Sequence, residues 1–168
     1  MMQQINAAGL NIIKSYEGIL DGDPATVNLD PYLCPAGVWT IGWGHALRKG
    51  GQLLRGKENK AVAFAMFPGG VTLAKAEVML RNDAEDASTS VETMVTSVLT
   101  LNQFSALVSL VFNIGAGNFK KSTLLAKLNA GKYDDAAREF ARWNMSNGEV
   151  LRGLVARREA ERKLFCTP

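Results

Sequence analysis

A stretch of twelve residues, Cys34–His45, holds most of the side chains whose chemistry suits a reaction. It carries a thiol, a hydroxyl, two indoles and the only histidine of the chain. Pro35 and Gly37 suit the second and fourth positions of a type I turn, so the stretch begins with a turn. The β-branched and aromatic run Val38–Ile41 is typical of a short strand. The same residues also describe a β-hairpin that packs its aromatic rings on a small sheet.

One acid outside this stretch stands where proton transfer is favoured. Asn6 is a suitable N-cap for a helix that carries Leu10 and Ile13 and ends at Glu17 and Gly18. Gly18 fits the C′ position, where a left-handed backbone suits glycine. The Glu17 carboxylate then faces the negative end of the helix dipole, which disfavours its charged form. Glu17 is therefore interpreted either as a proton donor or as an ordinary exposed glutamate at a helix end.

Helices dominate the rest of the chain. Apolar spacing and capping residues predict a helix over 72–94, a core helix that begins with a capping box at Thr100–Gln103, short helices over 122–131 and 133–142, and a last helix over 152–165. This pattern predicts a small mixed lobe near the N-terminus, a linking helix and a helical lobe. Ligand clefts tend to form where two such units meet.

Two polar segments and one charged helix face are given structural interpretations. The 19–33 segment is expected to be a loop, because its acids lack the spacing of a calcium-binding loop. The 48–70 segment is expected to be a solvated loop with one buried turn, or else a basic flap near an anionic substrate. Five cations on the 152–165 helix are expected to be solvated, or to rest against an anionic polymer or lipid phosphate.

Composition describes an ordinary globular protein. The chain has 168 residues, 47% apolar and 21% charged, enough for one domain or two small lobes. A net charge of +3 is too small to indicate nucleic acid. We expect no membrane span and no secretory signal, because neither a run of about 20 apolar residues nor a signal-like N-terminus is found. Two widely separated cysteines predict neither a metal site nor a disulfide framework, and neither a metal nor an organic cofactor is expected.

Several motifs together resemble the phage-type lysozymes, the endolysins of glycoside hydrolase family 24. The similar segments run through most of the chain and are Ile13–Gly18, Val38–His45, Asn102–Gly117, Arg142–Asn144 and Gly153–Arg162. The resemblance implies an α+β, mainly helical fold with two lysozyme-like lobes in a single domain over 1–168. The small lobe would cover about 12–71, the linking helix about 72–94, and the helical lobe about 95–168, with the first helix packed on it.

By this resemblance the protein hydrolyses the β-1,4 bond between N-acetylmuramic acid and N-acetylglucosamine in bacterial peptidoglycan. The catalytic set of the family is a Glu, an Asp and a Thr, and Glu17 and Thr40 match the first and third. The position of the Asp, six residues before the Thr, holds Cys34. A minority of the family carries the same Cys-Pro-Ala-Gly-Val-Trp-Thr run, so Cys34 is interpreted as a functional variant.

The chemistry implied for these three residues is general acid catalysis in which a cysteine, Cys34, stands where the family has an aspartate. Glu17 is expected to be the general acid, and Thr40 to help hold the attacking water. An isolated cysteine is mostly neutral near pH 7, and a nearby Glu17 would disfavour a second negative charge. Cys34 is therefore expected either to position water through its sulfur or to become a thiolate as positive charge develops. Inversion follows the family, whereas a thiolate nucleophile would give retention.

The resemblance also implies substrate contacts at His45, Phe112, Asn113 and Ser122. His45 is expected to be a structural imidazole that supports Glu17 or a neighbouring acid, and the alternative is a catalytic base. Phe112 lies on the core face of its helix, so packing explains it equally well. The alternatives to a muramidase are a lytic transglycosylase, which needs one Glu, and a non-catalytic peptidoglycan-binding protein. We expect a monomer that stays in the host cytoplasm until a holin releases it to the periplasm or cell wall.

Overall fold

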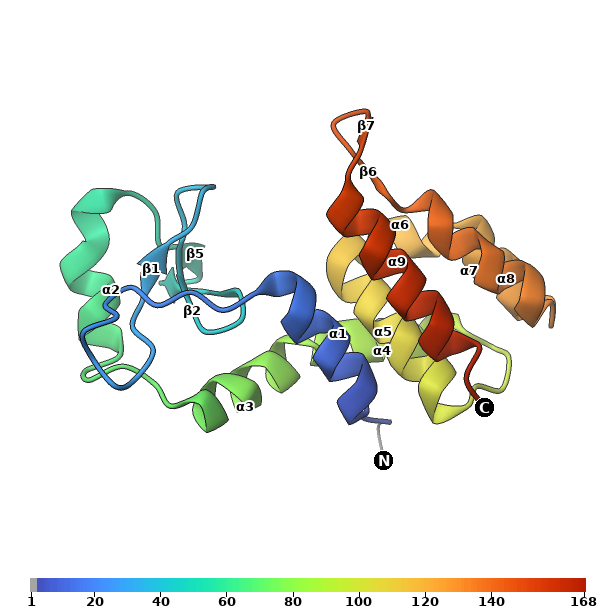
Figure 1. Cartoon of the computed structure of the whole chain (residues 1–168), viewed down its shortest axis with the longest axis horizontal. Helices are drawn as coiled ribbons and strands as arrows, with labels where there is room; N and C mark the ends of the chain where they lie inside the picture. The colour runs from blue at the N-terminus through green and yellow to red at the C-terminus, as the bar shows by residue number, and fades with distance from the viewer. Residues whose placement is uncertain (1–2) are drawn as a thin grey trace. The chain divides into compact units, whose positions relative to one another are not determined.

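The computed structural model describes residues 3–168 (Figure 1). The chain forms two compact units. The sheet unit is Glu17–Asp83, and the helical unit combines the residues up to Tyr16 with Ala84–Pro168. In the part of the chain that is described, every helix is too short or too polar to cross a membrane.

The sheet unit contains a three-stranded antiparallel sheet in the order β1-β2-β3. Its elements in chain order are β1 (Tyr32–Leu33), β2 (Trp39–Ile41), β3 (His45–Ala46), the hairpin of β4 (Arg48–Lys49) and β5 (Gln52–Leu53), the 3₁₀ helix η1 (Lys57–Asn59), α2 (Lys60–Met66) and α3 (Leu73–Asp83). All three residues of the central strand β2 are buried, and Trp39 and Ile41 belong to the core of the unit.

Trp39 joins the 48–70 segment to the sheet. Its Nε1 atom donates to the Gly56 carbonyl at 2.8 Å, and its ring meets Phe64 of α2 edge-on, with ring centroids 6.2 Å apart. Leu54 and Ala63 of the same segment belong to the buried core of the unit. The segment is therefore a hairpin and a helix packed on the sheet, and the expectation of a largely solvated loop was wrong.

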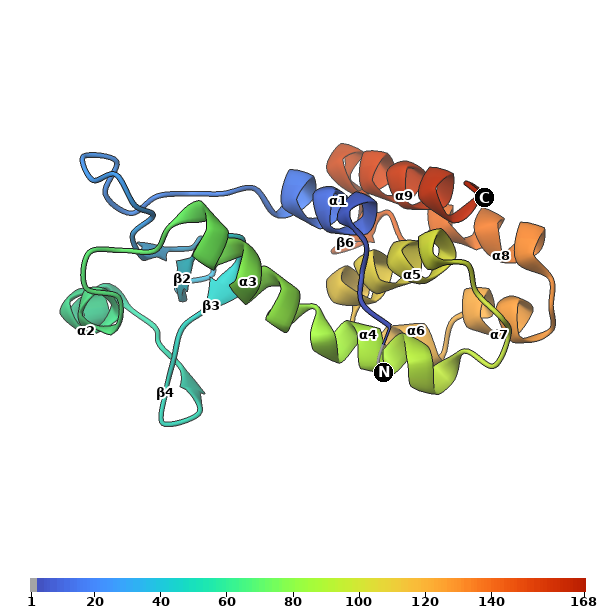
Figure 2. The same cartoon turned by 90° about the horizontal axis from the view of Figure 1, so that it is seen from below.

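The helical unit is built around one buried helix. Its elements are α1 (Ala7–Glu17, whose last residue belongs to the sheet unit), α4 (Glu85–Met94), α5 (Leu101–Ile114), α6 (Ala116–Lys120), α7 (Thr123–Asn129), α8 (Tyr133–Glu139), η2 (Phe140–Arg142), the hairpin of β6 (Met145–Ser146) and β7 (Glu149–Val150), and α9 (Arg152–Phe165). Helix α5 packs against α4 and α9, and Figure 2 shows it between them.

Two predicted helix starts agree with the structure, and one predicted helix is divided into two. The Asn6 side chain accepts from the Gly9 N–H at 2.9 Å, as expected of the N-cap of α1. Thr100 and Gln103 form the predicted capping box of α5. The single helix predicted over 72–94 is two helices, α3 and α4, separated at Ala84. Asn82 and Asp83 before the break are weak helix formers, and the break coincides with the boundary between the units.

The last helix buries part of the charge that was expected to be solvated. Arg157, Arg158 and Glu161 are 3%, 1% and 0% exposed, so for these residues the expectation was wrong. Both arginines pair with the Glu161 carboxylate, at 3.2 Å from Arg157 and 2.7 Å from Arg158. Ser109 of α5 donates to the same carboxylate at 2.7 Å.

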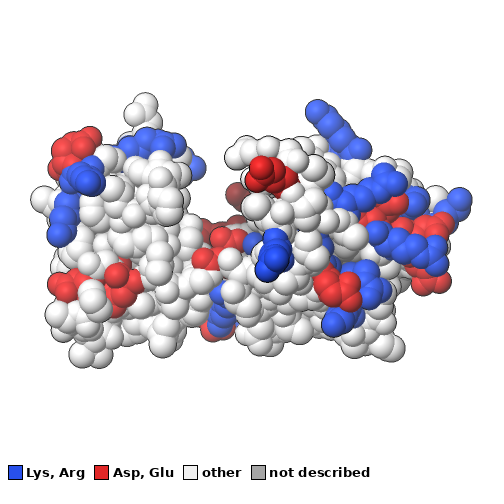
Figure 3. Space-filling model, turned by 45° about the horizontal axis from the view of Figure 1, so that its top comes forward, with Lys and Arg blue, Asp and Glu red and all other residues white. Residues whose placement is uncertain are grey.

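Cations that remain on the surface of α9 have acidic neighbours. Arg162 pairs with Glu159 at 2.9 Å. On the face of the helical unit shown in Figure 3, Lys and Arg atoms lie among Asp and Glu atoms. A surface of mixed sign does not create the one-sign field that would favour lipid phosphate or an anionic polymer.

Candidate active site

Glu17 is the last residue of α1, and Gly18 ends the helix with φ of 69°. The carboxylate lies beside the turn that joins β2 to β3. A Cβ atom added to Gly44 of this turn would lie 3.6 Å from Glu17 Oε2. Gly44 has φ of 78°, which favours glycine, and the absence of a side chain keeps the space beside the carboxylate open.

Cys34 and Thr40 lie on the same face of the sheet. The Gly37 N–H donates to the Cys34 carbonyl at 2.8 Å and closes the predicted turn. Beyond the turn, Tyr32 is paired directly with Thr40. Cys34 directly follows β1, and its N–H donates to the Val38 carbonyl at 2.9 Å, so the antiparallel pairing continues to this residue. Residues two apart along such an extended segment share a face, as do directly paired residues on neighbouring strands. The Tyr32 phenol, the Cys34 thiol and the Thr40 hydroxyl therefore project to one side.

The surroundings of Cys34 lower the pKa of its thiol. Partial burial by itself raises this pKa, but hydrogen bonds from the N–H groups of Val38 and Ala36 oppose it. A hydrogen bond from the Thr40 hydroxyl and the positive charge of Arg55 lower it further. The net shift of the thiol pKa is downward, opposite to the direction expected from a nearby Glu17 charge.

Tyr32 links Cys34 with Glu17 electrostatically. Burial raises the pKa of the Tyr32 phenol, and the charges of Cys34 and Glu17 raise it further. Since the phenol responds to both groups, the predicted acid and the predicted thiol lie in one electrostatic neighbourhood of the sheet unit.

His45 is held by an acid from another element. Its Nδ1 atom lies 2.9 Å from both Oδ1 and Oδ2 of Asp83, the last residue of α3. The arrangement ties β3 to α3 and fixes the ring. It agrees with the interpretation of His45 as an imidazole supporting a neighbouring acid, while its predicted contact with substrate stays a prediction.

The three predicted substrate residues of the helical unit differ in environment. Phe112 of α5 is partly buried, whereas Asn113 is exposed and its Oδ1 atom accepts from Arg158 Nη1 at 3.0 Å. Ser122 is buried at the N-cap of α7, where its hydroxyl accepts from the Leu125 N–H and donates to the Phe119 carbonyl. The Ser122 hydroxyl thus makes hydrogen bonds within the helical unit, and Asn113 is the one of the three residues that is exposed to solvent.

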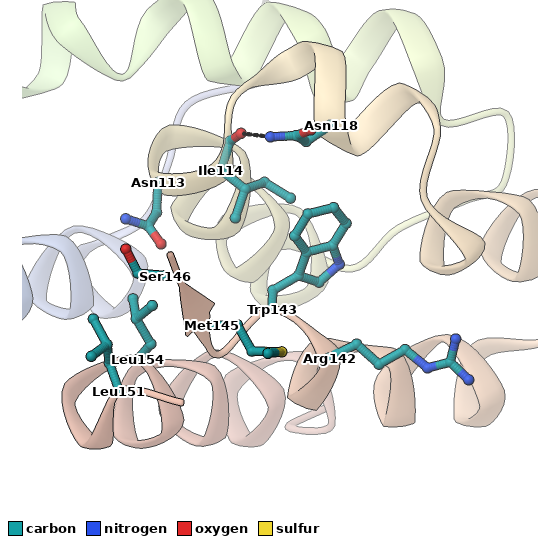
Figure 4. A pocket seen from close by; sticks show the side chains of 9 residues that line it. All are labelled: Asn113, Ile114, Asn118, Arg142, Trp143, Met145, Ser146, Leu151 and Leu154. Atoms are coloured by element: carbon teal, nitrogen blue, oxygen red, sulfur yellow. Dashed lines mark hydrogen bonds between the residues drawn. The ribbon is translucent and has the colours of Figure 1, made fainter. Parts of the chain in front are cut away.

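Asn113 opens onto a cavity of about 580 Å³ within the helical unit (Figure 4). In Figure 4 the Asn113 amide, the Ile114 side chain and the Trp143 indole border the same space. The lining residues are Asn113, Ile114, Asn118, Arg142, Trp143, Met145, Ser146, Leu151 and Leu154. An aromatic ring with amide groups around it suits the mixed polar and apolar surface of an acetylated sugar or a peptide.

Four residues of these two sites were missed as candidates by sequence reasoning. Trp143 lies in a segment that matches the family, which was a usable signal for a site. Tyr32 could have been found from its strand, because it lies two residues before Cys34. Asp83 gave no signal, and Arg55 was one of several cations in the 48–70 segment, because only the folded backbone brings these residues to His45 and to the Cys34 turn.

The fold is that of a lysozyme, as the sequence predicted. The family described as phage lysozyme matches residues 23–161. The chain belongs to this family, and its mainly helical α+β fold is confirmed by solved relatives.

Two named endolysins illustrate the sequence relationship. The endolysin of Bacillus phage B103 is 39% identical over 163 residues, which are 97% of this chain and 54% of that protein. The endolysin of Acyrthosiphon pisum secondary endosymbiont phage 1 is 38% identical over 165 residues, covering 96% of this chain and 97% of that protein. The chain thus spans about half the length of the first relative and nearly all of the second.

Solved structures show the same fold. The crystal structure of a mutant of P22 lysozyme has a TM-score of 0.76 and 30% identity, covering 99% of this chain and 100% of that one. The muramidase domain of SpmX from Asticaccaulis excentricus has a TM-score of 0.73 and 34% identity, covering 99% of each chain.

Proposed function

We propose that this lysozyme hydrolyses the β-1,4 bond between N-acetylmuramic acid and N-acetylglucosamine in peptidoglycan, as an endolysin that lyses the phage host. Glu17 acts as the general acid, and Cys34 occupies the role that an aspartate fills in the family. The observation that carries this assignment is the shared face of Cys34 and Thr40, with a thiol whose pKa is lowered by its hydrogen bonds after the opposing effect of burial.

The proposed reaction is a single displacement. Glu17 gives its proton to the glycosidic oxygen as the bond from that oxygen to the anomeric carbon breaks. A water oxygen bonds to the anomeric carbon from the opposite face, and its proton passes to the Cys34 thiolate. Thr40 holds the water or the sulfur through its hydroxyl. The product has an inverted anomeric centre, and proton exchange with solvent restores Glu17 and Cys34.

A covalent route is distinguished by its stereochemistry. If the Cys34 sulfur attacked the anomeric carbon, a thioglycoside would form and its hydrolysis would retain the configuration. If Cys34 stayed a neutral thiol, it would only position water. The lowered pKa of the thiol, set by backbone and Thr40 hydrogen bonds against burial, favours the thiolate as general base.

We propose that the helical unit contributes substrate contacts through its cavity. Arg158 fixes the orientation of the Asn113 amide, and Trp143 supplies an aromatic face in the same cavity. Trp143→Ala should raise KM more than it lowers kcat, because binding away from the broken bond is shared by ground and transition states. A loss confined to kcat would contradict a binding role.

The protein is proposed to act as a monomer that reaches the wall only after a holin opens the inner membrane. Its relatives include proteins named SAR-endolysin, such as that of Enterobacteria phage P21, at 32% identity over 138 residues. Expression with and without a holin gene distinguishes release that depends on the holin from release that does not. Lysis that needs the holin supports the proposal, and equal lysis without it overturns holin dependence.

The assignment of Cys34 is tested on purified peptidoglycan with the wild type, Cys34→Asp, Cys34→Ser and Cys34→Ala. Mass spectrometry of the released sugars should find reducing N-acetylmuramic acid ends. Cys34→Asp should keep activity, while the serine and alanine variants lose most of it. Wall clearance by Cys34→Ala at the wild-type rate would contradict the assignment, and anhydro-sugar ends would identify a transglycosylase.

A further inference from the structure

Arg55 comes from the 48–70 segment, which has no role in the mechanism described so far. Backbone contacts fix its position beside the Cys34 turn. Arg55 forms an antiparallel bridge with Val38, and the Gly56 N–H donates to the Gly37 carbonyl at 3.1 Å. One residue earlier, Leu54 accepts from the Trp39 N–H at 2.8 Å. The backbone around Arg55 therefore runs along the turn and the start of β2.

The Arg55 side chain reaches the same turn. Its Nη1 atom donates to the Ala36 carbonyl at 3.2 Å. Ala36 lies between Cys34 and Gly37, and its own N–H is one of the donors to the Cys34 sulfur. A guanidinium keeps its positive charge at any pH at which a protein is folded, so it can brace a carbonyl and act as a fixed charge at once.

We propose that Arg55 is a positioning residue that holds the Cys34 turn in place and favours the thiolate form of Cys34 through its charge. By this means the 48–70 segment acts on the reaction. The catalytic consequence rests on the proposed function of Cys34, whereas the effect on the thiol itself does not.

The charges around the thiol set the size of the expected effect. Tyr32 from β1 and Glu17 from the end of α1 belong to the same electrostatic neighbourhood. Burial raises the pKa of Cys34, hydrogen bonds lower it, and the charge of Arg55 lowers it by a smaller amount. Arg55 is exposed, so water and salt screen its charge. Its removal should therefore change thiol reactivity by a few fold, and less at high ionic strength.

Arg48 is a matched control from the same segment. It is also exposed, and its Nη1 atom also donates to a backbone carbonyl, that of Gly51, at 3.1 Å. That carbonyl belongs to the β4–β5 hairpin and not to the Cys34 turn. Arg48→Gln thus removes an equivalent charge and an equivalent hydrogen bond away from the thiol.

The first experiment measures alkylation of Cys34 by iodoacetamide, a neutral reagent, against pH. All variants carry Cys166→Ser, so that one thiol reacts. At pH 7 and low salt, Arg55→Gln should react about two- to threefold more slowly than its parent, because an exposed charge pair contributes only a small free energy. Arg55→Lys should recover most of the rate, and Arg48→Gln should match the parent. Equal rates for Arg55→Gln and its parent, or an equal loss in Arg48→Gln, would overturn the proposal.

The second experiment places Arg55→Gln in the Cys34→Asp background and measures peptidoglycan hydrolysis. A carboxylate with an ordinary pKa of about 3.9 is ionised at pH 7 without a nearby cation. Arg55→Gln should therefore lower the activity of the enzyme that carries Cys34, and should change the activity of the Cys34→Asp enzyme little. Equal losses in both backgrounds would mean that Arg55 acts only on the turn geometry and would overturn its electrostatic role. If Arg55→Gln slows the alkylation of Cys34 but leaves hydrolysis by the enzyme that carries Cys34 unchanged, the catalytic role of Cys34 is contradicted.

Discussion

Tyr32 of β1 faces Thr40 of β2 as its direct partner in the antiparallel pair. This register places the Thr40 hydroxyl on the face that carries the Cys34 thiol. The hydroxyl donates to the Val38 carbonyl at 3.1 Å, and it also serves as a hydrogen-bond partner of the Cys34 sulfur. A hydroxyl has one proton, so donation to a thiolate must replace donation to the carbonyl.

The Thr40 hydroxyl is therefore predicted to be needed and its methyl group to be dispensable. Thr40→Val keeps the shape of the side chain and should lower kcat on peptidoglycan by about 10²-fold, the scale of one positioned proton-transfer partner. Thr40→Ser keeps the hydroxyl and should stay within a few fold of the wild type. Steady-state hydrolysis of soluble glycan fragments measures both, and equal rates for valine and serine would contradict the role.

The lowered pKa of Cys34 predicts a pH dependence that can be isolated by comparison with Cys34→Asp. Below the pKa of the thiol, the thiolate fraction falls about tenfold for each pH unit, while an aspartate stays ionised down to about pH 4. The ratio of kcat/KM for Cys34→Asp to that of the wild type should therefore rise as pH falls. It should level off above the pKa of the thiol. Both enzymes carry Glu17, so the comparison isolates the group at position 34.

The same ratio tests the competing role of Cys34. A neutral thiol that only positions water does not depend on the thiolate fraction. In that case the ratio would change with pH only as the aspartate titrates, near an ordinary pKa of about 4. A ratio that stays flat from about pH 5 up to the pKa of the thiol would therefore rule out the thiolate.

The buried charges of α9 predict a large loss of stability in one variant. Burial raises the pKa of the Glu161 carboxyl and lowers that of the Arg158 guanidinium, so each charge depends on the other to offset desolvation. Glu161→Gln leaves Arg157 and Arg158 without their shared counter-charge. It should lower the free energy of unfolding by about 3–5 kcal/mol, measured by urea denaturation.

Glu159→Gln is the matched control on the same helix. Glu159 is 46% exposed and pairs directly with Arg162 at the surface, so its loss should change the free energy of unfolding little. If the two variants unfold at the same urea concentration, the buried cluster does not carry the stability assigned to it.

The helices were predictable because their signals are local. Asn6, Thr100 and Ser122 cap their helices as the sequence indicates, and Gly18 ends α1 with a left-handed backbone. Caps and apolar spacing act within one or two turns, so they can be read without the fold. The break between α3 and α4 at Ala84 was not predicted, because no glycine or proline marks it.

The environment of the site was less predictable because it depends on distant segments. Arg55 meets the Cys34 turn, and Asp83 meets His45, only after the backbone folds. For the same reason the direction of the Cys34 pKa shift was not predicted, since neither the turn N–H groups nor Arg55 could be placed. The buried Arg158 was missed because a charged face on a helix is usually solvated, and its partner on α5 is remote in sequence.

A variant at Gly44 should separate backbone strain from chemistry. The φ of 78° at this position strains any other residue, and an added Cβ would touch Glu17 Oε2 at 3.6 Å. Gly50 has φ of 58°, with no atom within 4 Å of an added Cβ. Both Gly44→Ala and Gly50→Ala should lose about 1–2 kcal/mol of unfolding free energy. Hydrolysis should fall about tenfold in Gly44→Ala alone, because the methyl group occupies the space beside the proton donor. Equal hydrolysis by the two alanine variants would place the reacting oxygen on another side of Glu17.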